Sequence, residues 1–145
     1  MTIQQGLTNS FKQDMLQAGQ NIITDTLYMA LYTALASVDS TTAAYTAVNE
    51  VVGTGYTAGG NPVTGAVLST DVNTGTVYVN FNNVSWPGAN FTARGALIYN
   101  TSKSNKSVLV LDFGADKSFN TINNTVTMPV NSATTALIRF CLLYT

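Results

Sequence analysis

The feature that most constrains the fold is the alternation of apolar and polar residues along several short segments. Leu27, Met29 and Leu31 occupy every second position of DTLYMALYT (25–33), and GTVYVNFNN (75–83) repeats the pattern. Successive side chains of a β-strand point to opposite faces, so this period of two predicts strands with one buried face. The same reasoning predicts further strands at residues 66–70, 93–100, 107–113, 124–130 and 135–144.

Short turn-rich pieces separate these segments. DVNTG (71–75) and NTSKSNK (100–106) connect neighbouring strands closely enough to predict hairpins. SVLVLDF (107–113) is apolar almost throughout, which is typical of a strand covered on both faces, and GADKS (114–118) after it is expected to be a turn. About seven short strands predict a mainly β chain, either an antiparallel β-sandwich or a closed barrel.

The N-terminal segment has a different period. Leu7, Phe11 and Met15 recur at every fourth position of residues 4–18, and Gly19 follows directly. This spacing places the three side chains on one face of an α-helix, so an amphipathic helix is predicted over residues 4–18. A length of 145 residues predicts a single domain over 1–145, with a β core from about residue 25 onward.

Charged residues are scarce. Only 9% of the residues are charged, against about 25% in ordinary soluble domains. Such a surface is either solvated by hydroxyls and amides, as in secreted lectin-like domains, or hidden in an assembly, which we favour. The net charge of −1 gives no indication of a nucleic acid partner. No apolar run is long enough for a membrane helix and no signal peptide is recognisable, so neither a membrane nor secretion is expected.

The longest stretch without a predicted element is residues 34–65, which include GTGYTAGG (53–60). The first six residues of GTGYTAGG match a dinucleotide-binding pattern. That pattern needs a helix to start inside it, and the GGNP of residues 59–62 prevents one. We therefore expect these glycines to permit close backbone approach, with Tyr56 as an anchor in a contact. A connection of this length is commonly a binding arm.

Catalytic residue types are nearly absent. The chain has no histidine, so no histidine relay is possible, and Glu50 is the only glutamate. The single cysteine, Cys141, excludes an intrachain disulfide and is expected to be a small core residue. LDFG (111–114) contains the Asp-Phe-Gly of protein kinases without their other motifs. We expect no enzyme activity, no metal and no cofactor.

Two arginines are predicted among apolar residues and therefore need partners. Arg94 lies in FTARGAL, and Arg139 lies in ALIRFCLLY. An unpaired buried charge is strongly unfavourable. The partner is either Asp112 or Asp116 of the same chain, or a carboxylate across a subunit interface, where arginine is enriched.

Three segments, residues 27–60, 84–100 and 108–118, resemble a family of small virion structural proteins of tailed bacteriophages. The resemblance spans about residues 11 to 140, and its most specific pieces are NEV, GTGYTAGG and ARGA. It implies a capsid cement or decoration protein that sits on the capsid as a homotrimer and clamps subunits of the major capsid protein. A neck or tail component is the alternative within the virion.

The resemblance implies a virion location, most specifically the capsid surface, after assembly in the bacterial cytoplasm. The N-terminal helix and residues 34–65 are the candidate arms. A carbohydrate-binding adhesin domain is the alternative from another class, because the 7 Tyr, 6 Phe and 1 Trp could stack on sugar rings. The candidate interface residues are Leu7, Phe11, Met15, Tyr56, Trp86, Arg94 and Arg139.

Overall fold

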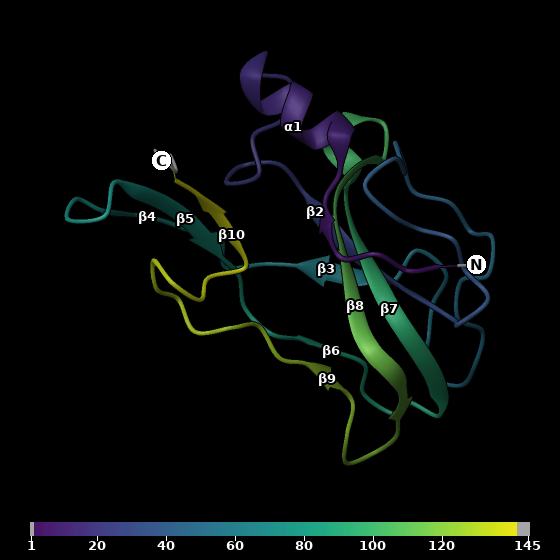
Figure 1. Ribbon diagram of the computed structural model, residues 1–145. Coiled ribbons are helices and arrows are strands. Elements are labelled where there is room, and N and C mark those ends of the chain that lie inside the picture. The colour runs from purple at the N-terminus through teal and green to yellow at the C-terminus, as the bar shows by residue number, and fades with distance from the viewer. Residues whose placement is uncertain (1, 142–145) are drawn as a thin grey trace.

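A computed structural model describes residues 2–141 of the chain. Over this range the chain is mainly β, with antiparallel sheets and one α-helix (Figure 1), so the predicted fold class is confirmed at this level. The barrel alternative is wrong, because the sheets do not close on themselves. The elements are β1 (Gly6–Leu7), α1 (Asn9–Leu16), β2 (Leu27–Tyr32), β3 (Asn61–Val63), β4 (Val67–Asp71), β5 (Thr76–Asn80), β6 (Val84–Ser85), β7 (Phe91–Asn100), the 3-10 turn η1 (Thr101–Lys103), β8 (Lys106–Phe119), β9 (Thr125–Val126) and β10 (Ile138–Phe140).

A five-stranded sheet with the order β1-β8-β7-β2-β3 forms the centre of the fold. β7 and β8 make the hairpin predicted at NTSKSNK, and η1 lies in their connection. β2 pairs with β7 from Leu27↔Asn100 to Tyr32↔Gly95, so two strands far apart in sequence lie side by side. The long β7–β8 hairpin is therefore the scaffold on which the earlier segments assemble.

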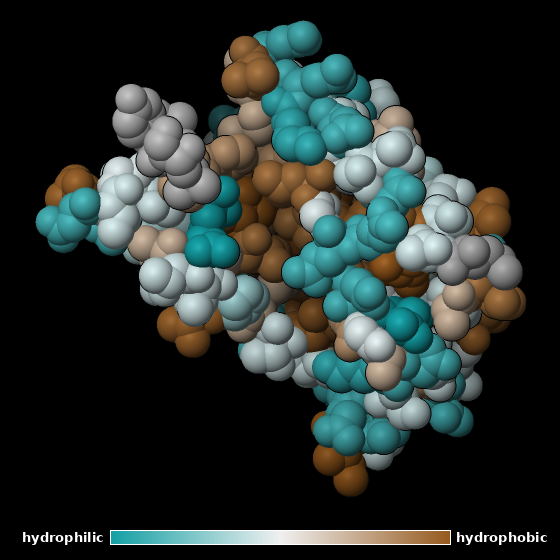
Figure 2. All heavy atoms as spheres, in the orientation of Figure 1, coloured by the Kyte–Doolittle hydropathy of each residue, from teal (hydrophilic) through white to brown (hydrophobic). Residues whose placement is uncertain are grey.

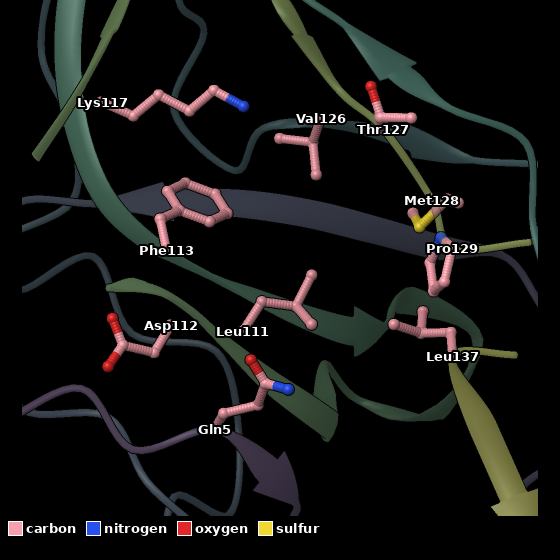
Figure 3. A pocket seen from close by; sticks show the side chains of 10 residues that line it. All are labelled: Gln5, Leu111, Asp112, Phe113, Lys117, Val126, Thr127, Met128, Pro129 and Leu137. Atoms are coloured by element: carbon pink, nitrogen blue, oxygen red, sulfur yellow. The ribbon is translucent and has the colours of Figure 1, made fainter. Parts of the chain in front are cut away.

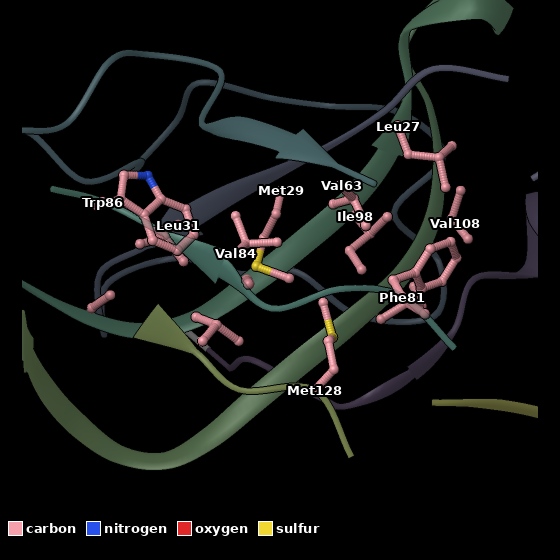
Figure 4. Close-up of a cluster of buried hydrophobic side chains, with 14 of the residues drawn as sticks. Leu27, Met29, Leu31, Val63, Phe81, Val84, Trp86, Ile98, Val108 and Met128 are labelled. Carbon is pink, nitrogen blue, oxygen red and sulfur yellow. The ribbon is translucent and has the colours of Figure 1, made fainter. Parts of the chain in front are cut away.

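Both faces of this central sheet are covered. The predicted alternation along β2 is confirmed, because Leu27, Met29 and Leu31 enter the main core (Figure 4). The residues between them, Ala30 and Tyr32, belong to a second apolar cluster on the opposite face. Tyr32 is fully buried and Tyr28 is half-buried, so the expectation of only one buried face is wrong for β2. The second cluster consists of Ile3, Ala30, Tyr32, Ala36, Val38, Leu97, Tyr99 and Val110.

Two smaller sheets extend the structure. β10, β5 and β4 form a three-stranded sheet, and β6 pairs with β9. The hairpin predicted at DVNTG is confirmed, because β4 and β5 pair from Val67↔Asn80 to Asp71↔Thr76. In Figure 1 the three-stranded sheet projects to the left, away from the central sheet. Its inner end reaches the main core through Val79 and Ile138, while its outer end does not.

The N-terminal helix is shorter than predicted. It spans Asn9–Leu16, because β1 pairs with β8 immediately before it and Thr8 caps its first turn. The Thr8 side chain accepts a hydrogen bond from the Phe11 amide at 3.4 Å. Leu7 therefore lies on a strand, and the expected stripe of Leu7, Phe11 and Met15 on one helix is wrong at its first residue.

Three predicted strands have different ends. Residues 107–113 continue to Phe119, and GADKS (114–118) is a bulged part of β8 with Gly114 at a φ of +77°, not a turn between strands. Residues 124–130 contribute only β9, after which the Met128 amide donates to the Asn83 side chain at 2.8 Å and Pro129 has no N–H to donate. Residues 135–144 contribute β10, with Cys141 exposed beyond it and residues 142–144 outside the described part.

Residues 34–65 do not form a protruding arm. Ala36 and Val38 pack in the second apolar cluster, and Val51 and Val63 pack in the main core. In Figure 1 the blue loops of this segment lie to the right, close to the strands of the central sheet. The segment instead covers one face and one edge of that sheet.

Candidate functional site

The glycine-rich stretch surrounds a buried carboxylate. Glu50 is only 7% exposed, and three donors from its own segment reach it. The Tyr45 and Tyr56 hydroxyls donate to its two oxygens at 2.6 Å each, and the Gly59 amide donates at 2.7 Å. Hydrogen bonds to a charged acceptor are among the stronger ones in proteins, so Glu50 ties this loop together.

Glu50 and Tyr56 also complete the edge of the central sheet. β3 covers β2 only from Leu27 to Met29. Beyond that point the Val51 amide donates to the Leu31 carbonyl at 2.9 Å, and the Leu31 amide donates to the Tyr56 hydroxyl at 2.9 Å. Exposed strand edges invite unwanted pairing. The loop therefore satisfies edge groups that β3 does not reach.

The tyrosines of this region are held in their neutral form. Burial, followed by the hydrogen bond to Glu50, raises the pKa of both Tyr45 and Tyr56 well above the ordinary tyrosine value. Burial is also the main cause of the raised pKa of Tyr32 and Tyr99. A neutral hydroxyl is the form that donates to Glu50, so burial and hydrogen bonding favour the same protonation state.

Two glycines of the stretch are required by close backbone approach, as predicted. Gly60 has a φ of +78°, and a Cβ added to it would overlap the Met29 carbonyl. A Cβ on Gly55, also at +78°, would come within 2.6 Å of the Gly88 carbonyl oxygen. These positions are bends against neighbouring backbone, and Tyr56 anchors the loop within its own chain.

Arg94 has internal partners. Its Nε lies 3.5 Å from Asp112 Oδ1 and its Nη1 lies 3.9 Å from Asp116 Oδ1. The bulge between Asp112 and Lys117 brings both carboxylates near the single arginine of β7. The intrachain alternative is therefore confirmed for Arg94. For Arg139 the expectation of an apolar setting is wrong, because its side chain is exposed on β10.

An apolar groove opens between α1 and the three-stranded sheet. Its volume is about 390 Å³, and Figure 2 shows the hollow with hydrophobic side chains gathered in it. Leu68, Val77 and Phe140 lie on one face of the sheet and are 56%, 38% and 37% exposed. No lining residue is charged. The lining residues are Met15, Ala18, Gln20, Asn21, Ile22, Ile23, Leu68, Val77, Val79 and Phe140.

Polar contacts hold the α1 wall of this groove in place. The Lys106 ammonium contacts both Asp14 oxygens at 2.9 Å, and the Gln20 amide donates to Asp14 at 3.0 Å. The hydrogen bond from Lys106 lowers the pKa of Asp14. The Gly19 amide closes the helix by donating to the Asp14 carbonyl at 2.7 Å. These contacts fix the helix end to β8, so the groove is a preformed surface.

A second hollow lies beside the β8 bulge (Figure 3). Its volume is about 350 Å³, and Leu111, Phe113 and Met128 contribute apolar walls. The Lys117 ammonium lies 5.7 Å from the centre of the Phe113 ring, within range of a cation–π contact. Asp112 at the rim contacts Arg94, so this hollow carries charges that the groove lacks.

The predicted interface residues separate into two groups. Phe11 is 0% and Trp86 is 1% exposed, so both belong to the chain's own core and cannot contact a partner in this conformation. Leu7, Tyr56 and Arg94 are half-buried in contacts within the chain. Met15 lines the groove, and Arg139 is exposed on β10.

Sequence reasoning missed the other groove residues. Val77 and Phe140 lie beyond the row of Val79 and Ile138 that reaches the main core, whereas Leu68 pairs with Val79 and is exposed on the edge strand β4. The scarcity of charged residues was the sequence signal for an interaction surface, but it does not identify the residues that form that surface. Ile23 lies in the loop after α1, which is held by the hydrogen bond from Gln20 to Asp14. No local sequence pattern indicates this contact.

The described residues contain neither a cluster of metal-ligand side chains nor a membrane-spanning helix. Among residues 2–141, no three histidine, cysteine, aspartate or glutamate side chains gather as a potential metal site. In the same range, no helix is long and apolar enough to cross a membrane. Comparison with protein-family models, curated proteins and solved structures finds no match to this chain.

Proposed function

We propose that the chain is a structural protein of a tailed-phage virion, and specifically a capsid cement protein that works by binding and not by catalysis. The observation that carries this proposal is the apolar groove, whose lining includes no charged residue. Monomeric proteins rarely leave large contiguous apolar patches exposed, and such patches commonly mark interaction sites. The core of a protein interface is likewise poor in charge.

The scaffold suits such a role. The smaller sheets and the central sheet would act as a sandwich-like support, with the Glu50 loop fixing one side and the groove exposed on the other. Residues such as Leu68 can be desolvated without stripping water from an ion. The partners are further copies of the chain, as a homotrimer, and the major capsid protein on the capsid surface.

The decisive test is binding to phage shells. Wild-type chain should cosediment with shells of the phage that encodes it, at a stoichiometry close to that of the major capsid protein. Leu68→Asp places a charge in the groove, and we expect at least tenfold weaker binding. Ile122→Asp is the matched control, because Ile122 is 87% exposed and does not line the groove.

Each outcome of this test bears on the proposal. Equal loss of binding in Leu68→Asp and Ile122→Asp would argue against the groove as the contact. About a dozen copies per particle, counted by electron microscopy, would indicate a neck or tail component. No binding by the folded wild-type chain would reject the virion role.

A further inference from the structure

The three-stranded sheet has two open edges. β4 and β10 each pair with β5 and with no other strand of residues 2–141. Edge strands are normally protected by central charges, proline or bulges. β4 has the sequence VLSTD, pairs regularly with β5 along its whole length, and carries one charge, at its last residue. The β4 edge is therefore open to pairing with another strand, whereas Arg139 at the centre of β10 restricts that edge to a partner that neutralises its charge.

Opposite charges mark these two edges. Asp71 ends β4, and Arg139 lies at the centre of β10. Arg139 pairs with Tyr78, which pairs with Ser69, so Arg139, Ser69 and Asp71 share one face of the sheet. In one copy β5 lies between the two edges, which are therefore about 10 Å apart.

Neither charge has an ion-pair partner within the described residues. The salt bridges of residues 2–141 join Arg94 to Asp112 and Asp116, and Lys106 to Asp14. In a chain with only 13 charged residues among 145, two unpaired opposite charges on opposite edges of one small sheet form a complementary pair of surfaces. Charge complementarity of this kind sets register and partner choice.

We propose that β4 of one copy pairs with β10 of the next copy, so that Asp71 meets Arg139 across the contact and the small sheet continues from copy to copy. This inference rests on the self-association included in the proposed function. The second copy is the occupant, because both complementary edges belong to the same chain. The contact is heterologous, since it joins two different strands.

The shared face determines the direction of pairing. A neighbour turned over so that its β10 runs antiparallel to β4 would present Arg139 on the face opposite Asp71. A parallel neighbour keeps both side chains on one face. Repeating this heterologous contact from copy to copy closes a ring when the rotation between neighbours divides a full turn, and otherwise forms an open filament.

Charge reversal tests the contact directly. Asp71→Arg and Arg139→Asp each create like charges at the contact, and we expect at least tenfold weaker self-association in light scattering after size exclusion. The combination Asp71→Arg/Arg139→Asp restores opposite charges and should recover the wild-type assembly. Lys12→Asp is the control for the change in net charge, because Lys12 is exposed on α1, and it should associate normally.

The possible results are distinct. A monomeric wild-type chain at high micromolar concentration, single variants that associate normally, or a double variant that stays dissociated while folded by circular dichroism would each overturn the inference. Rescue by the double variant would support it even if each single variant is less stable. Binding to shells is measured separately, so a chain that assembles through these edges but ignores shells would reject the virion role alone.

Discussion

The two sides of the molecule differ in which groups they bury and which they expose. On one side, residues 34–65 fold back on the central sheet and use Glu50 to gather two hydroxyls and an amide. On the other side, the three-stranded sheet projects and leaves Leu68 and Phe140 open to solvent. On the first side a carboxylate is buried with both of its oxygens hydrogen-bonded, whereas on the second side apolar side chains are exposed to solvent.

This contrast shows where internal stability and binding capacity lie. A buried carboxylate with three donors stabilises the loop only while every donor is present, since an unsatisfied buried group is unfavourable. Exposed apolar side chains contribute little to the folded chain, but they gain free energy when a partner covers them. Substitutions in the two regions should therefore affect different measurements.

The largest effect is expected at Gly60. In Gly60→Ala the new methyl group would overlap the Met29 carbonyl at a left-handed φ of +78°. We expect a loss of about 4 kcal/mol in the free energy of unfolding, or failure to fold. Gly75→Ala is the control, because Gly75 has a φ of +64° and no neighbour within 4 Å. Its expected loss is about 1 kcal/mol, measured by urea denaturation. Equal losses would show that close approach at Gly60 is unimportant.

Glu50→Gln should have the next largest effect. The glutamine side chain has one acceptor oxygen in place of two. Its NH₂ group would face one of the groups that donate a hydrogen bond to Glu50 in the wild type. We expect a loss of about 2–3 kcal/mol in the free energy of unfolding. Tyr45→Phe, which removes one hydrogen bond to Glu50, should lose about 1 kcal/mol. A fully stable Glu50→Gln protein would contradict the role given to this carboxylate.

Alkaline pH should lower the free energy of unfolding through the tyrosines that contact Glu50. The pKa values of Tyr45 and Tyr56 are raised in the folded chain, so the neutral hydroxyls stabilise it below the ordinary tyrosine pKa of about 10. That stabilisation is lost as pH rises above this value, because the unfolded chain then releases protons that the folded chain retains. Urea midpoints should fall more steeply above pH 10 in the wild type than in Tyr45→Phe/Tyr56→Phe. Parallel curves for the two proteins would argue against this account.

The smallest stability effect is expected in the groove. Leu68→Ser should change the free energy of unfolding by less than about 0.5 kcal/mol, because Leu68 is 56% exposed. The same variant should weaken association with shells severalfold. Val130→Ser is the control for both measurements, since Val130 is 74% exposed and does not line the groove. A large loss of stability in Leu68→Ser would place this residue with the core instead.

The sequence predicted what depends on local period and not what depends on distant partners. Alternation located β2 and β5, and turn chemistry located both hairpins. The helix was predicted too long because the pairing of Leu7 with Leu109 overrides its helical spacing. GADKS contains turn residues, but β7 continues alongside it and holds it in the sheet.

The candidate site was less predictable. The close approach at Gly55 and Gly60 followed from residue type, whereas the partners of Glu50 depend on the path of a loop that has no periodic signal. Tryptophan is a residue type expected at contacts between proteins. Trp86 is nevertheless buried, and its Nε1 lacks a hydrogen-bond partner in the described structure. Residue type alone does not separate an anchor in the core from one on the surface.

The attachment of the N-terminal segment to β8 has a consequence for synthesis. The Thr8 hydroxyl bonds to the carbonyl of Ser107, 99 residues later, and β1 has no strand partner before β8 exists. During translation, residues 6–8 therefore remain without these partners until the chain has been extended to β8. During that interval Phe11 lacks its β8 neighbours, so an apolar side chain of the later core stays exposed on the nascent chain.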